Sequence, residues 1–197
     1  MLSGVLSALV RVDAAAFSAL RAHRWSSLDG VMWLVSAVAR GGVLWMVMGL
    51  VLAARQPARW MAFVQLLLAI GLAALLADSV FKPLVGRSRP FEIERQLRTY
   101  GPRPDSRSFP SGHAATAFAG AAAISQLMPE ATAGFWLLAA VVAFSRIYLG
   151  VHYPLDVLGG MLVGIAAAAF VIGGTCWTDP IDSSSARSSR DRRRAER

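Results

Sequence analysis

The chain has 197 residues, of which 55% are hydrophobic and only 16% are charged, and its formal net charge is +8. Soluble domains carry about 45–50% apolar and about 25% charged residues, so this composition favours a membrane protein. Nucleic-acid binding needs an exposed basic face, whereas the basic residues gather in two places, 82–107 and 187–197, separated by apolar stretches. We therefore expect no nucleic-acid partner.

Residues 3–22 are expected to form an amphipathic helix. Apolar residues recur at helical spacing, and Ser7, Arg11 and Ser18 share the opposite side. Such a helix either lies in the membrane interface or packs on a small domain, and the apolar stretches that follow favour the interface. Arg11 and Asp13 interrupt the apolar positions before a secretory signal is complete, so we expect no cleavable signal peptide.

Five apolar stretches follow, and they predict an all-α integral membrane protein with about five transmembrane helices plus the N-terminal amphipathic helix. The stretches are 31–54, 60–80, 114–128, 131–149 and 157–177. A bilayer core requires about 20 helical residues. The first stretch is broken by Arg40-Gly41-Gly42, so it is either one bent span or an interfacial helix followed by a span. The third reaches spanning length only if its helix begins near Ser111.

The stretches divide the chain into an amphipathic segment (1–27), a membrane domain (28–178) and a basic disordered tail (179–197). Alternation of the spans places the long loop 82–112 on the face opposite the tail, Arg55 and Arg59. The positive-inside rule assigns the tail to the cytoplasm, so the long loop is expected to face outward in spite of its own seven basic residues.

Three short segments fall on that outward face. They read K-P-L-V-G-R-S-R-P from Lys82, S-F-P-S-G-H from Ser108 and S-R-I-Y-L-G-V-H-Y-P-L-D from Ser145. Lys82, Arg89 and Arg146 would repel one another unless an anion lies between them, and phosphate oxygens suit their donors. Each cation alone could be an interfacial anchor, and Asp78 is expected to pair with Lys82 one turn away.

The same segments supply groups for phosphoryl transfer. Ser111 and Gly112 open a helix whose free backbone N–H groups form an anion site. Asp156 can accept the Nδ1–H of His152, which leaves Nε2 free to attack phosphorus and form a phosphohistidine. His113 can then act as general acid on the leaving oxygen and as base for water in the second step. Taken alone, the His152–Asp156 pair could equally be a structural hydrogen bond.

Together the segments resemble the signature of the type-2 phosphatidic acid phosphatase family, also called lipid phosphate phosphatases. That signature reads K-x6-R-P, P-S-G-H and S-R-x5-H-x3-D, and no position is substituted here. The resemblance covers roughly residues 28–177 and implies a metal-independent phosphatase without a cofactor. It implies that His152, His113 and Asp156 are catalytic. It also implies a phosphate-binding set of Lys82, Arg89, Ser111, Gly112 and Arg146.

The resemblance implies a lipid phosphate or diphosphate as substrate. As a small member of bacterial type with an outward site, this chain resembles undecaprenyl diphosphate phosphatases. Undecaprenyl diphosphate is therefore the substrate expected first, and the bacterial cytoplasmic membrane is the expected location. Phosphatidylglycerophosphate, phosphatidic acid and lipid A phosphates remain alternatives. A phosphotransferase, a vanadium-dependent peroxidase and a non-catalytic lipid-binding or transport protein are the competing classes, and the effect of His152→Ala separates catalysis from binding. The sequence does not determine the oligomeric state.

Overall fold

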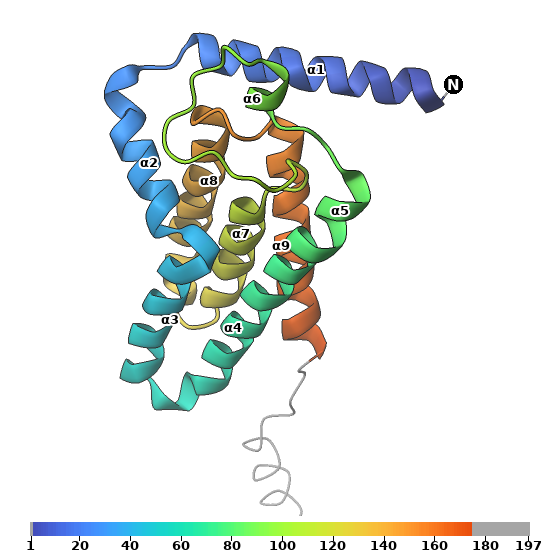
Figure 1. The fold of residues 1–197 in the computed structure, drawn as a ribbon. Coiled ribbons are helices and arrows are strands. Elements are labelled where there is room, and N and C mark those ends of the chain that lie inside the picture. The colour runs from blue at the N-terminus through green and yellow to red at the C-terminus, as the bar shows by residue number, and fades with distance from the viewer. Residues whose placement is uncertain (1, 175–197) are drawn as a thin grey trace, which may run out of the picture.

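The computed structural model describes residues 2–174, and every regular element within them is a helix (Figure 1). The long elements are α1 (Leu2–Ala22), α2 (Asp29–Val38), α3 (Val43–Arg55), α4 (Trp60–Leu75), α7 (Gly112–Ile124), α8 (Thr132–Tyr148) and α9 (Pro154–Gly174). Two short helices, α5 (Lys82–Val85) and α6 (Pro90–Ile93), belong to the long connection between α4 and α7. The all-helical prediction is confirmed, whereas the predicted tail and the end of the last predicted span lie outside the described residues.

Helix α7 is the centre of the bundle. It packs against α4, α8 and α9, and ten of its residues are buried (Figure 1). Glycines bring α9 unusually close, because a Cβ at Gly160 would lie 2.3 Å from the Ser111 carbonyl oxygen and one at Gly164 would lie 2.2 Å from the Ala115 carbonyl oxygen. The small residues of α9 therefore set the helix separation, as expected for helices that associate in lipid.

Within residues 2–174, three helical stretches are long and apolar enough to cross a membrane: Pro57–Ile93, Pro129–Tyr148 and Pro154–Gly174. A fourth is added if the pair Ser26–Val38 and Arg40–Arg55, bent by 44°, counts as one span. The predicted count of five also included α7. Its 13 residues make a helix about 20 Å long, shorter than the roughly 30 Å core of a bilayer.

The bend between α2 and α3 is made by a short 3-10 turn, η2 (Arg40–Gly42). Gly41 and Gly42 have φ values of 61° and 80°, which glycine adopts without steric cost. A Cβ at Gly42 would also lie 2.6 Å from Cγ2 of Ile70 on α4. The two glycines thus fix the direction of the bend and hold Arg40 at the turn, facing the middle of the bundle.

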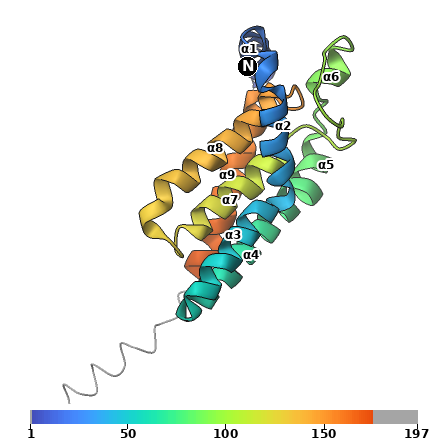
Figure 2. The same cartoon turned by 90° about the vertical axis from the view of Figure 1, so that its left-hand side faces the viewer.

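Helix α1 runs across one end of the bundle, and the two views show it lengthwise and end-on (Figures 1 and 2). Its contact with the bundle is narrow. Phe17 is buried edge-on against the ring of Tyr153, with centroids 5.2 Å apart, and Asp13 is buried beside it. Most other apolar residues of α1 are exposed, including Val5 and Val12. The predicted helix is therefore present and leaves an apolar surface uncovered at this end of the bundle.

Candidate active site

A cavity of about 260 Å³ lies toward the α1 end of the bundle, where the three motif segments meet. Six of the eight predicted site residues line it: Lys82, Arg89, Gly112, His113, Arg146 and His152. They come from α5, the residue before α6, the first turn of α7, the last turn of α8 and the turn before α9. The prediction that the three segments share one end of the bundle is confirmed.

Arg89 is the most enclosed cation of the cavity, with a side chain only 1% exposed. Its guanidinium donates to the backbone carbonyls of Ser106 at 2.6 Å and Val151 at 2.8 Å. Nη1 also lies 3.2 Å from Nε2 of His152. Because arginine carries only donors, Nε2 is the acceptor of this contact, and the proton of a neutral His152 is on Nδ1.

Lys82 and Arg146 are the other two motif cations of the cavity, which Arg40 of η2 also lines. Lys82 Nζ lies 2.6 Å from Oδ1 of Asp78 and 3.1 Å from the Ser106 hydroxyl, so the expected pairing with Asp78 is confirmed. Arg146 donates from Nη1 to the Ser36 hydroxyl of α2, and its buried Nε has no hydrogen-bond partner in the described part of the chain. Arg146 therefore retains an unsatisfied donor beside the cavity.

His152 and Asp156 stand at the start of α9. Nδ1 of His152 lies 3.5 Å from Oδ2 of Asp156, slightly longer than a hydrogen bond, and it has no other partner among the described residues. The pKa of His152 is lowered to about 4, mainly by burial and also by the nearby cations Arg89 and Arg146, while Asp156 opposes the shift. The imidazole is thus neutral near pH 7, with the lone pair of Nε2 at the cavity.

Asp156 itself is fully buried and does not line the cavity. Its carboxylate accepts hydrogen bonds from the Ser108 hydroxyl, from the backbone N–H of Tyr153 at 2.9 Å and from Nη1 of Arg87 at 2.8 Å. The Tyr153 contact also caps α9, because Asp156 is its third residue. One carboxylate therefore starts the helix and stands behind the histidine.

A buried chain of charges continues from Asp156 to α1. The second nitrogen of Arg87, Nη2, lies 2.6 Å from Oδ2 of Asp13, and the guanidinium stacks over the ring of Tyr153 at 4.3 Å. The other oxygen of Asp13 accepts the backbone N–H of Leu155 at 2.8 Å. Sequence reasoning missed Arg87 and Asp13. The available signal was the position of Arg87, two residues before Arg89 in the first motif.

The remaining predicted residues lie at the start of α7. Ser111 is fully buried and caps the helix, because its hydroxyl accepts the backbone N–H of Ala114, and its own N–H donates to the Asp156 carbonyl at 2.8 Å. Gly112 lines the cavity, where a Cβ would lie 3.1 Å from Oδ1 of Asp78. In residues 2–174 no three His, Cys, Asp or Glu side chains are grouped so that they could hold a metal ion.

Comparison with known proteins gives consistent matches. The model of the PAP2 superfamily matches residues 62–176. An undecaprenyl-diphosphatase of Sulfolobus acidocaldarius is 30% identical over 75% of this chain and 71% of its own length. A lipid A 4'-phosphatase of Porphyromonas gingivalis is 29% identical over 83% of this chain and 72% of its own length. The crystal structure of a transmembrane PAP2 type phosphatidylglycerolphosphate phosphatase from Bacillus subtilis superimposes with a TM-score of 0.69 at 25% identity, covering 88% of this chain and 89% of that one.

Proposed function

The chain belongs to the PAP2 superfamily and is a multi-pass membrane phosphatase of that family, and we propose that it converts undecaprenyl diphosphate to undecaprenyl phosphate through a phosphohistidine. The observation that carries the proposal is the convergence of Lys82, Arg89 and Arg146 with two histidines around one cavity. Three cations and a neutral imidazole suit the oxygens and the phosphorus of a terminal phosphate.

In the first step Nε2 of His152 attacks the terminal phosphorus. A bond forms between Nε2 and phosphorus, and the bond from phosphorus to the leaving oxygen breaks. Protonated His113 gives its proton to that oxygen, which departs on the lipid. Asp156 stabilises the charge that His152 acquires through Nδ1–H, and the cations stabilise the equatorial oxygens of the transition state.

In the second step water attacks the phosphohistidine. His113, now neutral, takes a proton from the water as the new oxygen–phosphorus bond forms and the bond to Nε2 breaks. Inorganic phosphate leaves, His152 returns to its neutral form and His113 is again protonated. The negative charge of the substrate phosphate beside His113 favours the protonated imidazole.

The choice of a polyprenyl diphosphate is supported by the relative from Sulfolobus acidocaldarius, whose name states that activity. The relative from Porphyromonas gingivalis, named a lipid A 4'-phosphatase, supports lipid A as the second candidate. The two substrates differ in the group that stays on the lipid after cleavage, a phosphate in the first and a sugar in the second. A substrate panel therefore distinguishes them.

We further propose that the membrane domain spans residues 28–178, with α7 as a fifth membrane-embedded helix enclosed by α4, α8 and α9. The active-site end, which carries α1 and the long loop, faces outward. Arg59 supports this arrangement. It lies in the turn between α3 and α4, at the end of the bundle opposite the long loop, and donates to the carbonyl of Leu127 at 2.7 Å in the turn between α7 and α8. Helix α1 would then lie in the outer interface with its apolar residues in lipid.

The test is phosphate release by the detergent-purified full chain in EDTA. Undecaprenyl diphosphate, phosphatidylglycerophosphate, phosphatidic acid and lipid A would be compared, with His152→Ala beside the wild type. We expect the fastest release from undecaprenyl diphosphate and a loss on the order of 10⁴-fold or more in the variant, because the nucleophile is gone. A phosphorylated wild-type enzyme should be trapped by rapid alkaline quench, because the N–P bond of a phosphohistidine is stable in base and is hydrolysed in acid.

His23 provides the matched control. It is the one histidine outside the motifs, at the end of α1, where Nδ1 contacts the Ala19 carbonyl at 2.9 Å. His23→Ala should keep wild-type release. Equal phosphate release by His152→Ala and the wild type would overturn the histidine mechanism. Faster release from lipid A than from undecaprenyl diphosphate would overturn the proposed substrate in favour of lipid A.

A further inference from the structure

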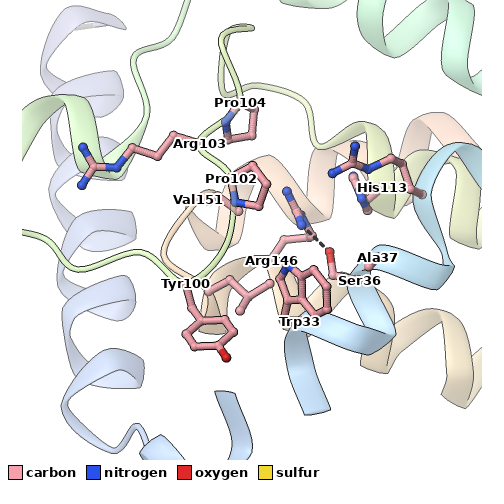
Figure 3. Close-up of a pocket in the computed structure, with 12 residues that line it drawn as sticks. Trp33, Ser36, Ala37, Tyr100, Pro102, Arg103, Pro104, His113, Arg146 and Val151 are labelled. Atoms are coloured by element: carbon pink, nitrogen blue, oxygen red, sulfur yellow. Dashed lines mark hydrogen bonds between the residues drawn. The ribbon is translucent and has the colours of Figure 1, made fainter. Parts of the chain in front are cut away.

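A second cavity of about 330 Å³ adjoins the phosphate cavity (Figure 3). Four residues line both: Arg40, Pro104, His113 and Arg146. The second cavity is completed by α2 and by the loop before α7, with Trp33 and Tyr100 at its sides (Figure 3). His152 lines only the first cavity, whereas His113 lines both.

The position of His113 indicates which group belongs in the second cavity. A phosphorus atom attacked by His152 must lie in the first cavity. In an in-line displacement the leaving oxygen is on the side of phosphorus away from the nucleophile, where the general acid stands. Because His113 borders the second cavity, the first atoms of the leaving group extend into it.

Two unpaired cationic groups face this space. Arg40 makes no hydrogen bond or ion pair with any described residue, although its side chain lines both cavities. The buried Nε of Arg146 also has no partner. A buried donor without an acceptor is costly, as for Nε of Arg146, and in a binding cavity an anionic ligand supplies the acceptor. Arg40 is exposed, so its guanidinium is accessible to the same ligand. These donors are not needed for the fold and are available to a ligand.

Arg103 borders the same cavity but is already engaged elsewhere. Its Nε donates to the Thr99 hydroxyl at 3.2 Å, its Nη2 donates to the Leu97 carbonyl at 3.3 Å, and the guanidinium lies over the ring of Phe91. Figure 3 shows it directed away from Arg146. The free positive charge of the second cavity therefore belongs to Arg40.

We propose that the second cavity binds the phosphate that stays on the lipid after cleavage, and that Arg40 is its binding residue. The ligand class is a lipid diphosphate, whose terminal phosphate occupies the first cavity. Arg40 offers a bidentate fork to the inner phosphate and stabilises the negative charge that this group gains when the bond breaks. This proposal rests on the proposed function and names the residue that selects a diphosphate over a monophosphate.

The walls beyond Arg40 suit the first carbons of an isoprenoid chain. Trp33 on α2 is 41% exposed and Tyr100 on the loop is 42% exposed, and both line the cavity. The loop approaches α2 closely at Gly101, whose φ is 87° and where a Cβ would lie 2.6 Å from Cδ1 of Trp33. An aromatic exit between α2 and the loop thus leads from the charged pocket toward the outer surface of the bundle.

The test compares two soluble substrates that differ by one phosphate, farnesyl diphosphate and farnesyl phosphate. For Arg40→Gln in the full chain we expect kcat/KM to fall about 10- to 100-fold for the diphosphate, as for loss of a charged hydrogen bond, and about threefold for the monophosphate. Arg40→Lys should recover part of the loss. Arg55→Gln, an exposed arginine at the far end of α3, is the matched control and should behave as the wild type.

A binding measurement supplies an independent readout. Inorganic diphosphate should inhibit the wild type at lower concentration than inorganic phosphate, and Arg40→Gln should remove that difference. Equal losses on both substrates, or no loss on either, would overturn the second phosphate site while leaving the phosphatase proposal intact. A wild type that releases phosphate from neither substrate nor from any lipid of the panel would overturn both proposals.

Discussion

The two walls of the active-site cavity differ in how completely their polar groups are already paired. On the wall formed by the start of α9, Asp156 lies behind His152 and accepts hydrogen bonds from Arg87, Ser108 and a backbone N–H, and only Nδ1 of His152, 3.5 Å from Asp156, is without a hydrogen bond among the described residues. On the wall formed by η2 and the end of α8, neither the Arg40 side chain nor Nε of Arg146 has a partner in the described part of the chain. We refer to these as the closed wall and the open wall.

The difference separates residues that hold their neighbours in place from residues that are available to bind the substrate. A buried group whose bonding capacity is filled by the protein holds its neighbours in place and has little left to offer a ligand. A donor that the protein leaves without a partner, whether buried as in Arg146 or exposed as in Arg40, is available to an acceptor on the ligand. We therefore expect changes on the closed wall to lower the turnover rate, and changes on the open wall to alter which phosphate groups are bound.

Apart from loss of the nucleophile itself, the most severe change on the closed wall is Asp156→Asn. The amide nitrogen of the asparagine would face the donor of either Arg87 or Ser108, and the side chain would no longer stabilise a charged His152. We expect kcat to fall on the order of 10⁴-fold, by analogy with loss of the carboxylate in a catalytic triad. The free energy of unfolding should fall by about 2–3 kcal/mol, because buried donors lose their acceptor.

Both effects are measured on the monodisperse fraction in detergent, by phosphate release and by thermal unfolding. Asp105→Asn, an exposed carboxylate of the long loop, is the control and should change neither. A kcat within tenfold of the wild type would mean that Asp156 only caps α9 and that the closed wall has no part in turnover.

A smaller loss is expected one contact farther away, for Arg87→Gln. Arg87 touches Asp156 and Asp13 but does not line the phosphate cavity, so we assign it as a positioning residue. Displacement of the carboxylate should lower kcat on the order of 10²-fold with little change in KM. Asp13→Asn should cost about tenfold, since Arg87 keeps its contact with Asp156.

If the three residues act as one chain, the double variant Asp13→Asn/Arg87→Gln should be no slower than Arg87→Gln alone. Arg87→Lys should restore part of kcat, which a merely structural loss would not show. Arg95→Gln, on the exposed loop, is the control. A rise in KM without a fall in kcat would move Arg87 from the closed wall to the substrate-binding set.

The smallest effect on activity is expected from lowering the pH. Because burial lowers the pKa of His152 to about 4, below its ordinary value of 6.5, the neutral nucleophile should persist from pH 7 down to about pH 5 and be lost only as the pH falls through about 4. Over the same window the unfolded chain binds more protons at this residue, so the contribution of His152 to stability rises with pH.

Direct titration of the imidazole by NMR in detergent separates this residue from ionisation of the substrate. His152→Ala identifies its signal and His23→Ala serves as reference. A pKa near 6.5 for His152 would show that water reaches the closed wall, and it would remove the distinction between the two walls.

The sequence predicted which residues meet at the site better than it predicted the contacts that hold them there. Spacing within the motifs brought Lys82, Arg89, His113 and Arg146 to one cavity, because alternating spans return each segment to the same end. The helix starts were also close, since α9 begins at Pro154 where 157 was predicted, and Ser111 caps α7, near where that helix was expected to begin if it spans the membrane. The span count was less determined. The apolar composition of α7 does not say whether such a helix faces lipid or is enclosed by its neighbours.

Composition and hydropathy by themselves determined a helical membrane protein, and the motifs, through their resemblance to a known family, predicted a phosphatase and the six residues that line one cavity, because helical period, hydropathy and motif order can be read along the chain. Only the tertiary structure decided how those residues are supported. The contacts of Arg87 with Asp13 and Asp156 join positions 74 and 69 residues apart. The tertiary structure alone likewise shows that the charge of Arg40 has no partner among the described residues. Whether a charged side chain is paired depends on which distant groups the packing of helices brings within about 3 Å, and no local pattern encodes that distance.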